Sequence, residues 1–179
     1  MTGHSDSFIP RAAGAPSELD FSNASQDDFE SLARDRVPVR SMRADDLDAI
    51  AAIDRRLTGR DRRDYLAAKL DEALHHSDVR VSLVAELDGL IVGFVMARVD
   101  LGAYGEVAPA GVIDTVGVDP GFAGKGVGRA LLSQLAANLG GLRVERLRSV
   151  IRWNDTAMIG FLAAMGFAPA PRLALARRL

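Results

Sequence analysis

Three glycines at alternate positions constrain the fold of this chain more than any other feature. They occupy positions 124, 126 and 128, directly after Val118-Asp119-Pro120 and before an apolar helical pattern. Proline has no amide to continue a ladder, so a buried strand is expected to end at Asp119-Pro120. Glycine permits positive φ and close approach of a ligand, and the first amides of a helix have no partner within it. The sequence pattern of residues 116–132 therefore predicts a strand, a turn and a helix start that together bind phosphate.

The spacing of these glycines excludes two common phosphate-binding loops. No segment supplies the GxxxxGK[ST] pattern of a P-loop. A dinucleotide-binding GxGxxG fails because Arg129 stands where the third glycine belongs. Lys125 and Arg129 add positive charge to the loop, which favours an anionic ligand. A glycine-rich turn without a ligand is the alternative interpretation.

Hydrophobic periodicity predicts an alternation of strands and helices. Strands are expected at 38–42, 79–86, 90–99, 112–118, 147–151 and 173–179, and helices at 47–57, 62–75, 127–139 and 155–165. Asp45 or Asp46 is expected to cap the first helix, Gly140-Gly141 to end the third, and Asp88-Gly89 to form a hairpin turn. The order β-α-α-β-β-β-α-β-α-β predicts an α/β fold, with a mixed, mostly antiparallel central sheet and helices on both faces.

Composition divides the chain into two parts. Residues 1–36 carry seven acids and three bases and show no periodicity, which predicts a flexible acidic leader with one short helix near 26–34. Residues 37–179 are expected to form one domain, in a chain that is 48% hydrophobic. The absence of cysteine excludes disulfides, thiolate metal sites and cysteine nucleophiles. No signal peptide or membrane span is apparent, so a cytoplasmic location is expected.

Two segments together resemble the GNAT superfamily of N-acetyltransferases, particularly small bacterial members that acetylate ribosomal proteins. The family pattern is a strand ending V-x-P, followed by [RQ]-x-x-G-x-[GA] at the start of a long helix. Val118-Asp119-Pro120 and the glycines at 126 and 128 match it, and 154–167 resembles the N-x-x-A…GF segment of the family. Two positions depart from the pattern. Ala123 replaces the expected Arg or Gln, and Leu162 stands where a tyrosine general acid is usual.

The resemblance implies an acyl-CoA-dependent N-acyltransferase that uses acetyl-CoA as co-substrate. By the same resemblance, the enzyme would acetylate a primary amine: a protein lysine, a protein N-terminus or a small amine. The amine would attack directly, without a metal or a covalent enzyme intermediate. Main-chain groups of the strand and loop would hold the cofactor, and Asn154 would contact it near the thioester. The implied residues are Val116, Val118, Lys125, Gly126, Val127, Gly128, Arg129 and Ala130. Nucleic acid and membrane partners are not expected, and a homodimer is favoured.

Acyl transfer needs a neutral amine, so a proton acceptor is expected. Asp114 is the first candidate because it lies on the central strand four residues before Val118, at an acidic position that some family members use. Its alternative is an ion pair with an arginine of the adjacent strand. Glu106 is the second candidate base, and Tyr104 is the first candidate acid, ahead of Tyr65.

Two further alternatives concern the chain as a whole and one basic segment. A catalytically inactive acyl-CoA-binding or sensing module would keep the phosphate loop without turnover, and an unrelated phosphate-binding interaction domain would prefer simple nucleotides. The segment 54–64 contains interleaved arginines and aspartates. It predicts either a surface that holds an acidic substrate or a solvated helix–turn–helix with internal ion pairs, and the second interpretation is preferred.

Overall fold

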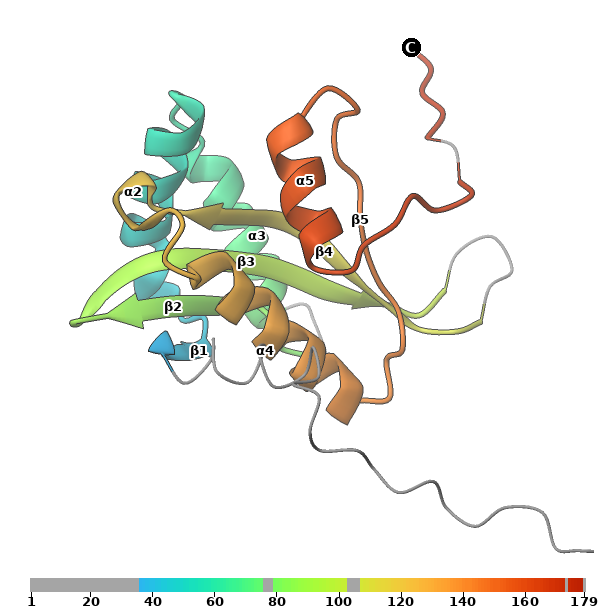
Figure 1. Cartoon of the computed structure of the whole chain (residues 1–179), viewed down its shortest axis with the longest axis horizontal. Coiled ribbons are helices and arrows are strands. Elements are labelled where there is room, and N and C mark those ends of the chain that lie inside the picture. Colours follow the sequence, from blue (N-terminus) through green and yellow to red (C-terminus); the bar gives the residue numbers. More distant parts are fainter. Residues whose placement is uncertain (1–35, 76–78, 103–106, 173, 179) are drawn as a thin grey trace, which may run out of the picture.

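A five-stranded mixed sheet forms the centre of the fold in the computed structural model, which describes residues 36–75, 79–102, 107–172 and 174–178 (Figure 1). The strands are β1 (Val39–Ser41), β2 (Leu83–Leu87), β3 (Leu90–Asp100), β4 (Ala110–Val118) and β5 (Leu147–Ser149), in that spatial order. Strands β1 to β4 pair antiparallel, and β5 pairs parallel to β4. The predicted mixed, mostly antiparallel sheet is confirmed.

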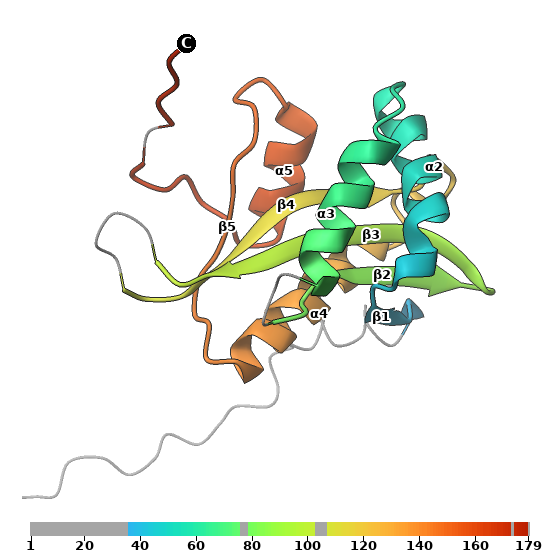
Figure 2. The same ribbon diagram turned by 180° about the vertical axis from the view of Figure 1, so that it is seen from behind.

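Helices cover both faces of this sheet, as predicted. They are α2 (Leu47–Thr58), α3 (Arg63–His75), α4 (Val127–Gly141) and α5 (Thr156–Ala164), with short 3-10 turns η1 (Ala44–Asp46) and η2 (Pro120–Phe122). Helices α4 and α5 lie in front of the sheet in Figure 1, and α2 and α3 lie in front of it in the reverse view of Figure 2. None of the helices in the described ranges is long and apolar enough to cross a membrane.

The alternation of side chains along β3 builds a separate apolar core on each face. Phe94 and Met96 belong to the cluster under α2 and α3, which includes Ile50. Val95 and Ala97 belong to the cluster under α4. Burial of both sets of alternating side chains fixes the register of the central strands, because a slip of one residue would move each set to the opposite face of the sheet.

The turn between β2 and β3 has the geometry that its sequence predicts. Asp88 and Gly89 both have positive φ, 51° and 75° respectively, and Leu87 pairs directly with Leu90. Two central residues with positive φ define a type I′ turn, the connection that matches the twist of a hairpin.

Several details differ from the prediction: β2 begins at Leu83 rather than at 79, and β5 ends at Ser149 rather than at 151. The expected strand at 173–179 is wrong in its described part, because residues 174–178 are exposed and form no strand. Pro169 and Pro171 precede this segment and supply no amide donors. Among residues 174–178, Leu175 is the only large apolar side chain. Helix α4 ends at Gly141, within the predicted glycine pair, and Arg143 then takes a left-handed φ of 58°. The leader and its short helix, at 1–35, lie outside the described residues.

A further difference concerns Asp46, which does not cap α2 with its side chain. Its carboxylate instead accepts a hydrogen bond from the Arg43 amide at 2.7 Å and two from the Arg40 guanidinium at 2.8 and 2.9 Å. Only 3% of the Asp46 side chain is exposed. Burial by itself raises the pKa of this carboxyl, but the bonds from Arg40 and Arg43 outweigh it and hold the pKa below its ordinary value. Asp46 therefore joins β1 to the start of α2 as a charged group.

We expect Asp46→Asn to lower the free energy of unfolding at pH 7 by about 1–3 kcal/mol, because it leaves buried donors imperfectly paired. A carboxyl with a depressed folded pKa contributes stability that is complete above its unfolded pKa, about 3.9. That stability is lost as pH falls through the lower folded pKa. The deficit of the variant should therefore shrink below about pH 4. Urea unfolding at several pH values measures it.

Asp45→Asn is the matched control, because Asp45 is exposed and adjacent. It should change the free energy of unfolding by less than about 0.5 kcal/mol. A deficit for Asp46→Asn that stays constant from pH 7 to pH 3 would contradict the proposed ionic role of this carboxylate.

Candidate functional site

Strands β4 and β5 pair over three residues and then separate. Their last pair is Ile113 with Ser149, although β4 continues to Val118. Beyond Ile113, the side of β4 that faces away from β3 has no strand partner among the described residues. Val116 and Val118 lie on this unpaired length, and their side chains pack against the α4 core. The separation leaves main-chain polar groups of a central strand available to a ligand.

The turn after β4 presents the amides of a helix start. Gly124 and Gly126 have φ of 74° and 83°, conformations that favour glycine. The first helical hydrogen bond of α4 runs from the Ala130 amide to the Gly126 carbonyl at 2.9 Å. Within the described ranges, the amides from Gly126 to Arg129 donate no hydrogen bond. They form a row of available donors at the positive end of the longest helix.

The third glycine serves packing between helices. A Cβ at Gly128 would lie 3.0 Å from ring atoms of Phe161. This position therefore lets α4 and α5 approach each other, whereas the two glycines before it shape the turn. The sequence pattern predicted the need for glycine at all three positions, but it did not distinguish these two reasons.

Two cations and one ion pair surround the turn. Lys125 lies over the Phe122 ring, with Nζ 4.6 Å from the ring centroid. Arg129 is half-buried on the first turn of α4, and Ala123 is exposed. The carboxylate of Asp119 accepts a hydrogen bond from the Gly121 amide at 2.9 Å and forms an ion pair with Arg56 of α2. This contact, which the sequence did not reveal, joins α2 to the start of the turn.

Asp114 lies where β4 and β5 diverge. Met96 pairs with Thr115 and Ala97 with Ile113, so Asp114 is the extra residue of a β-bulge on β4. Bulges re-aim side chains and end regular pairing. The Asp114 carboxylate is 19% exposed and points to the α3 face of the sheet, where it meets Lys69.

The carboxylate of Asp114 belongs to a charged network that crosses three strands and α3. It forms an ion pair with Arg98 of β3 and lies 3.5 Å from the Lys69 ammonium. Arg98 also bonds Asp100 at 3.0 Å, and Arg148 of β5 donates to Asp100 at 2.6 Å. The ion pair between Asp114 and an arginine of the adjacent strand is thus present. The bond to Asp114 is the main cause that raises the pKa of Arg98.

Periodicity did not identify Lys69, Arg98, Asp100 or Arg148 as site residues. The polar pair Arg98 and Asp100 near the end of an apolar strand was a usable signal, because residues two apart share one face. No sequence signal could identify Lys69, because its approach to Asp114 depends on how α3 lies on the sheet.

The remaining predicted residues are distributed as follows. Tyr104 and Glu106 lie in 103–106, outside the described residues. Asn154 is exposed in a turn closed by a 3.0 Å hydrogen bond from the Asp155 amide to the Arg152 carbonyl. Leu162 is buried in the core under α4. Its side chain has no ionisable group, so it cannot act as a general acid.

The basic segment at 54–64 contains one internal ion pair, which agrees in part with the preferred interpretation, and two of its arginines pair with residues outside the segment. Arg62 binds the buried Asp54 and lies over the Tyr65 ring at 5.6 Å, and Arg63 pairs with Asp48. Across the described residues, no group of three or more His, Cys, Asp or Glu side chains could hold a metal ion.

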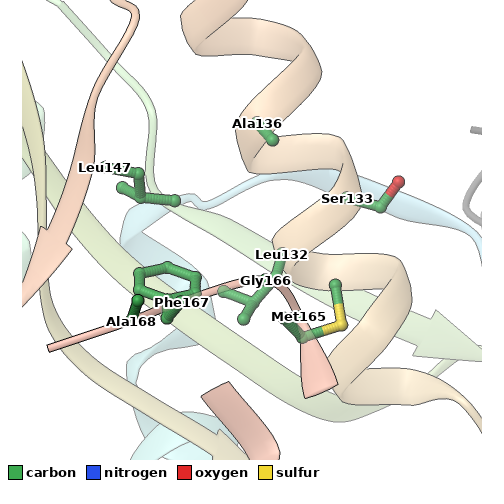
Figure 3. Close-up of a pocket in the computed structure, with 8 residues that line it drawn as sticks. All are labelled: Leu132, Ser133, Ala136, Leu147, Met165, Gly166, Phe167 and Ala168. Carbon is green, nitrogen blue, oxygen red and sulfur yellow. The ribbon is translucent and has the colours of Figure 1, made fainter. Parts of the chain in front are cut away.

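A hollow of about 310 Å³ lies between α4, the start of β5 and the turn after α5 (Figure 3). Its lining is apolar apart from the Ser133 hydroxyl, and the other lining residues are Leu132, Ala136, Leu147, Met165, Gly166, Phe167 and Ala168. No titratable side chain lines it. The lining of this hollow therefore offers no side chain for acid–base chemistry.

Comparisons with known proteins agree with this geometry. Residues 46–167 match the profile described as the acetyltransferase (GNAT) family. An acetyltransferase of Yersinia enterocolitica is 31% identical over 110 residues, which cover 62% of this chain and 72% of that protein. An acetyltransferase of Pectobacterium atrosepticum is 30% identical over 110 residues, with the same coverage.

Solved structures share the fold. The aminoglycoside N-acetyltransferase AAC(6')-Iy in complex with CoA superposes with a TM-score of 0.69 at 21% identity, covering 79% of this chain and 94% of that one. A ribosomal-protein-alanine N-acetyltransferase from Brucella melitensis biovar Abortus 2308 gives 0.60 at 23% identity, covering 80% and 99%. The divergent strands, the amide row and the matched profile lead to one assignment: the chain belongs to the GNAT acetyltransferase family and is an acyl-CoA-dependent N-acyltransferase with acetyl-CoA as co-substrate.

Proposed function

We propose that this protein transfers an acetyl group from acetyl-CoA to a primary amine, with the cofactor held along β4 and at the start of α4. The observation that carries the proposal is the row of available amides from Gly126 to Arg129 beside an unpaired strand edge. Such amides bind a pyrophosphate without side-chain charge. The cofactor supplies an activated acetyl thioester.

Each part of the site has a proposed task. Val116 and Val118 would bond the extended arm of the cofactor through their main chains, as an added strand does. Lys125 and Arg129 would add cationic side chains, and Lys125 would compensate for the alanine at 123. Asn154 would contact the cofactor near the thioester. Ala130 closes the first turn of α4 by donating to the Gly126 carbonyl, and so fixes the direction of the amide row.

Asp114 is proposed as the group that receives a proton from the acceptor amine. It is the first β4 residue beyond the pairing with β5, and one oxygen of its carboxylate faces the Lys69 ammonium rather than Arg98. The proton is proposed to reach Asp114 through a water molecule, because its carboxylate already pairs with Arg98 and lies beside the Lys69 ammonium. Glu106 and Tyr104 remain candidates for base and acid in 103–106.

The acceptor is proposed to be a protein lysine, a protein N-terminus or a small amine. Solved relatives by fold include both aminoglycoside and ribosomal-protein acetyltransferases, so fold alone does not select among these amines. A CoA-binding module without turnover is the second candidate function. The ion pairs of Asp114 and the apolar Leu162 favour it.

The phosphate site can be tested by a pair of substitutions that differ only in charge. Asparagine and aspartate both tolerate positive φ, so Gly126→Asn and Gly126→Asp should fold alike. We expect Gly126→Asp to bind CoA about tenfold or more weakly than Gly126→Asn, because it places a carboxylate beside the pyrophosphate. Isothermal titration of CoA, acetyl-CoA and ATP into the full chain measures the affinities.

Wild-type protein should bind CoA and acetyl-CoA much more tightly than ATP. Equal affinities of the two variants for CoA, or preference of the wild type for ATP, would overturn the proposed pyrophosphate site.

Asp114→Asn separates catalysis from cofactor binding. If Asp114 receives the proton, kcat/KM for a small primary amine should fall by about 100-fold or more, with the affinity for CoA changed less than about threefold. Release of the CoA thiol measures turnover, and calorimetry measures binding. An unchanged kcat would assign Asp114 to the ion-pair network alone, and binding without turnover by the wild type would support the inactive module.

A further inference from the structure

Lysine is scarce in this chain, and one lysine lies at the β4 divergence. Lysines and arginines together number 22, of which only Lys69 and Lys125 are lysines. Lys69 lies on α3 with its side chain 26% exposed. Arginine remains protonated and is not a nucleophile at ordinary pH. Lys69 is therefore the one described amine on this face of the sheet that could accept an acyl group.

Two carboxylates hold the Lys69 amine in place. Nζ is 2.7 Å from the Glu72 carboxylate and 3.5 Å from the Asp114 carboxylate. Asp114 is the bulge residue at which β4 leaves β5. The amine of Lys69 thus stands beside the group proposed to receive the proton of an acceptor, and next to the strand proposed to hold the thioester.

We propose that Lys69 is a site of self-acetylation, an inference that rests on the function proposed above. Lys69 Nζ, once neutral, forms an amide bond with the acetyl carbon, and the carbon–sulfur bond breaks with both electrons on sulfur. The proton released by nitrogen passes through Asp114 to the sulfur. The products are acetyl-lysine and free CoA, so no other reactant is needed.

The neighbouring charges predict the pH dependence of this modification. The bond to Glu72 is the main cause that raises the pKa of Lys69, burial opposes it, Asp114 adds to it, and Arg98 lowers it. Because only the neutral amine is nucleophilic, acetylation is slow at neutral pH. Its rate rises as pH approaches the raised pKa.

Acetylation would change the charge balance around Asp114. The amide carries no charge, so Arg98 would remain as the single cation paired with Asp114. One carboxylate oxygen would then be available to an incoming amine, and the modification would alter the strength of Asp114 as a base.

The test uses the full-length protein incubated with acetyl-CoA at pH 7 to 9, followed by peptide mass spectrometry. We expect an acetyl group on Lys69 that forms at least about tenfold faster than on Lys125. The rate constant should be independent of protein concentration, as for a reaction within one molecule. Heat-unfolded protein provides the background of chemical acetylation at both lysines.

Two substitutions should act in opposite directions. Asp114→Asn should slow acetylation of Lys69 by about tenfold or more, since it removes the proton acceptor. Glu72→Gln should speed it by about twofold at pH 8, because it removes one exposed ion pair that favours the ammonium. The Glu72 side chain is 49% exposed, so this variant should fold normally.

A readout without turnover uses an amine-specific acetylating reagent that does not involve CoA. Saturating CoA should protect Lys69 from this reagent at least about fivefold, because the inference places the thiol end of the cofactor near Nζ. A mixture of Asp114→Asn and Lys69→Arg proteins tests transfer between molecules, and Lys69 of the first protein should be acetylated no faster in the mixture than in the Asp114→Asn protein alone.

Equal acetylation of Lys69 and Lys125, faster acetylation of Asp114→Asn in the mixture than alone, or no protection by CoA would overturn the inference. Failure of the proposed function has a different signature. In that case CoA does not bind, or no amine is acetylated. Normal turnover of a small amine with an unmodified Lys69 would reject self-acetylation alone.

Discussion

The divergence of β4 from β5 is the constraint on which the rest of the site depends. Main-chain polar groups in a sheet interior are almost always paired, but from Asp114 to Val118 the side of β4 away from β3 has no strand partner in the part of the chain that the structure describes. A bulge at Asp114 shifts the register of β4 against β3 where the pairing with β5 has ended, and α5 follows β5 and packs in front of the sheet (Figure 1). The open edge, the amide row of α4 and the carboxylate at the bulge then lie along one length of chain.

Oppositely charged side chains pair with one another beside the divergence of β4 from β5. Strands β3, β4 and β5 are joined across the α3 face by alternating cations and anions, from Lys69 through Asp114, Arg98 and Asp100 to Arg148. Each partly buried carboxylate of this network has a cationic partner, as buried charges generally require. The network restricts the side chains that border the opening, which favours a preorganised site.

Local rules predicted most of the fold and only part of the site. The Asp88-Gly89 turn, the alternation of β3 and the glycine turn before α4 follow from short-range sequence patterns, and each was confirmed. The strand expected at 173–179 failed because periodicity cannot show whether a partner edge can receive it. Lys69 and Arg56 could not be predicted, since their partners lie 45 and 63 residues away along the chain. Such contacts depend on the placement of whole helices.

The ion pair between Arg56 and Asp119 has a thermodynamic consequence. One Asp119 oxygen accepts a hydrogen bond from the Gly121 amide of the turn before α4, and the other pairs with the Arg56 side chain of α2. The helix and the turn therefore share one carboxylate, so a displacement of either changes the bonds of the other. A ligand that shifts α2 would alter the affinity of the turn for its own ligand, and linkage requires the effect to be equal in both directions. A single exposed arginine thus links the position of α2 to the shape of the turn before α4.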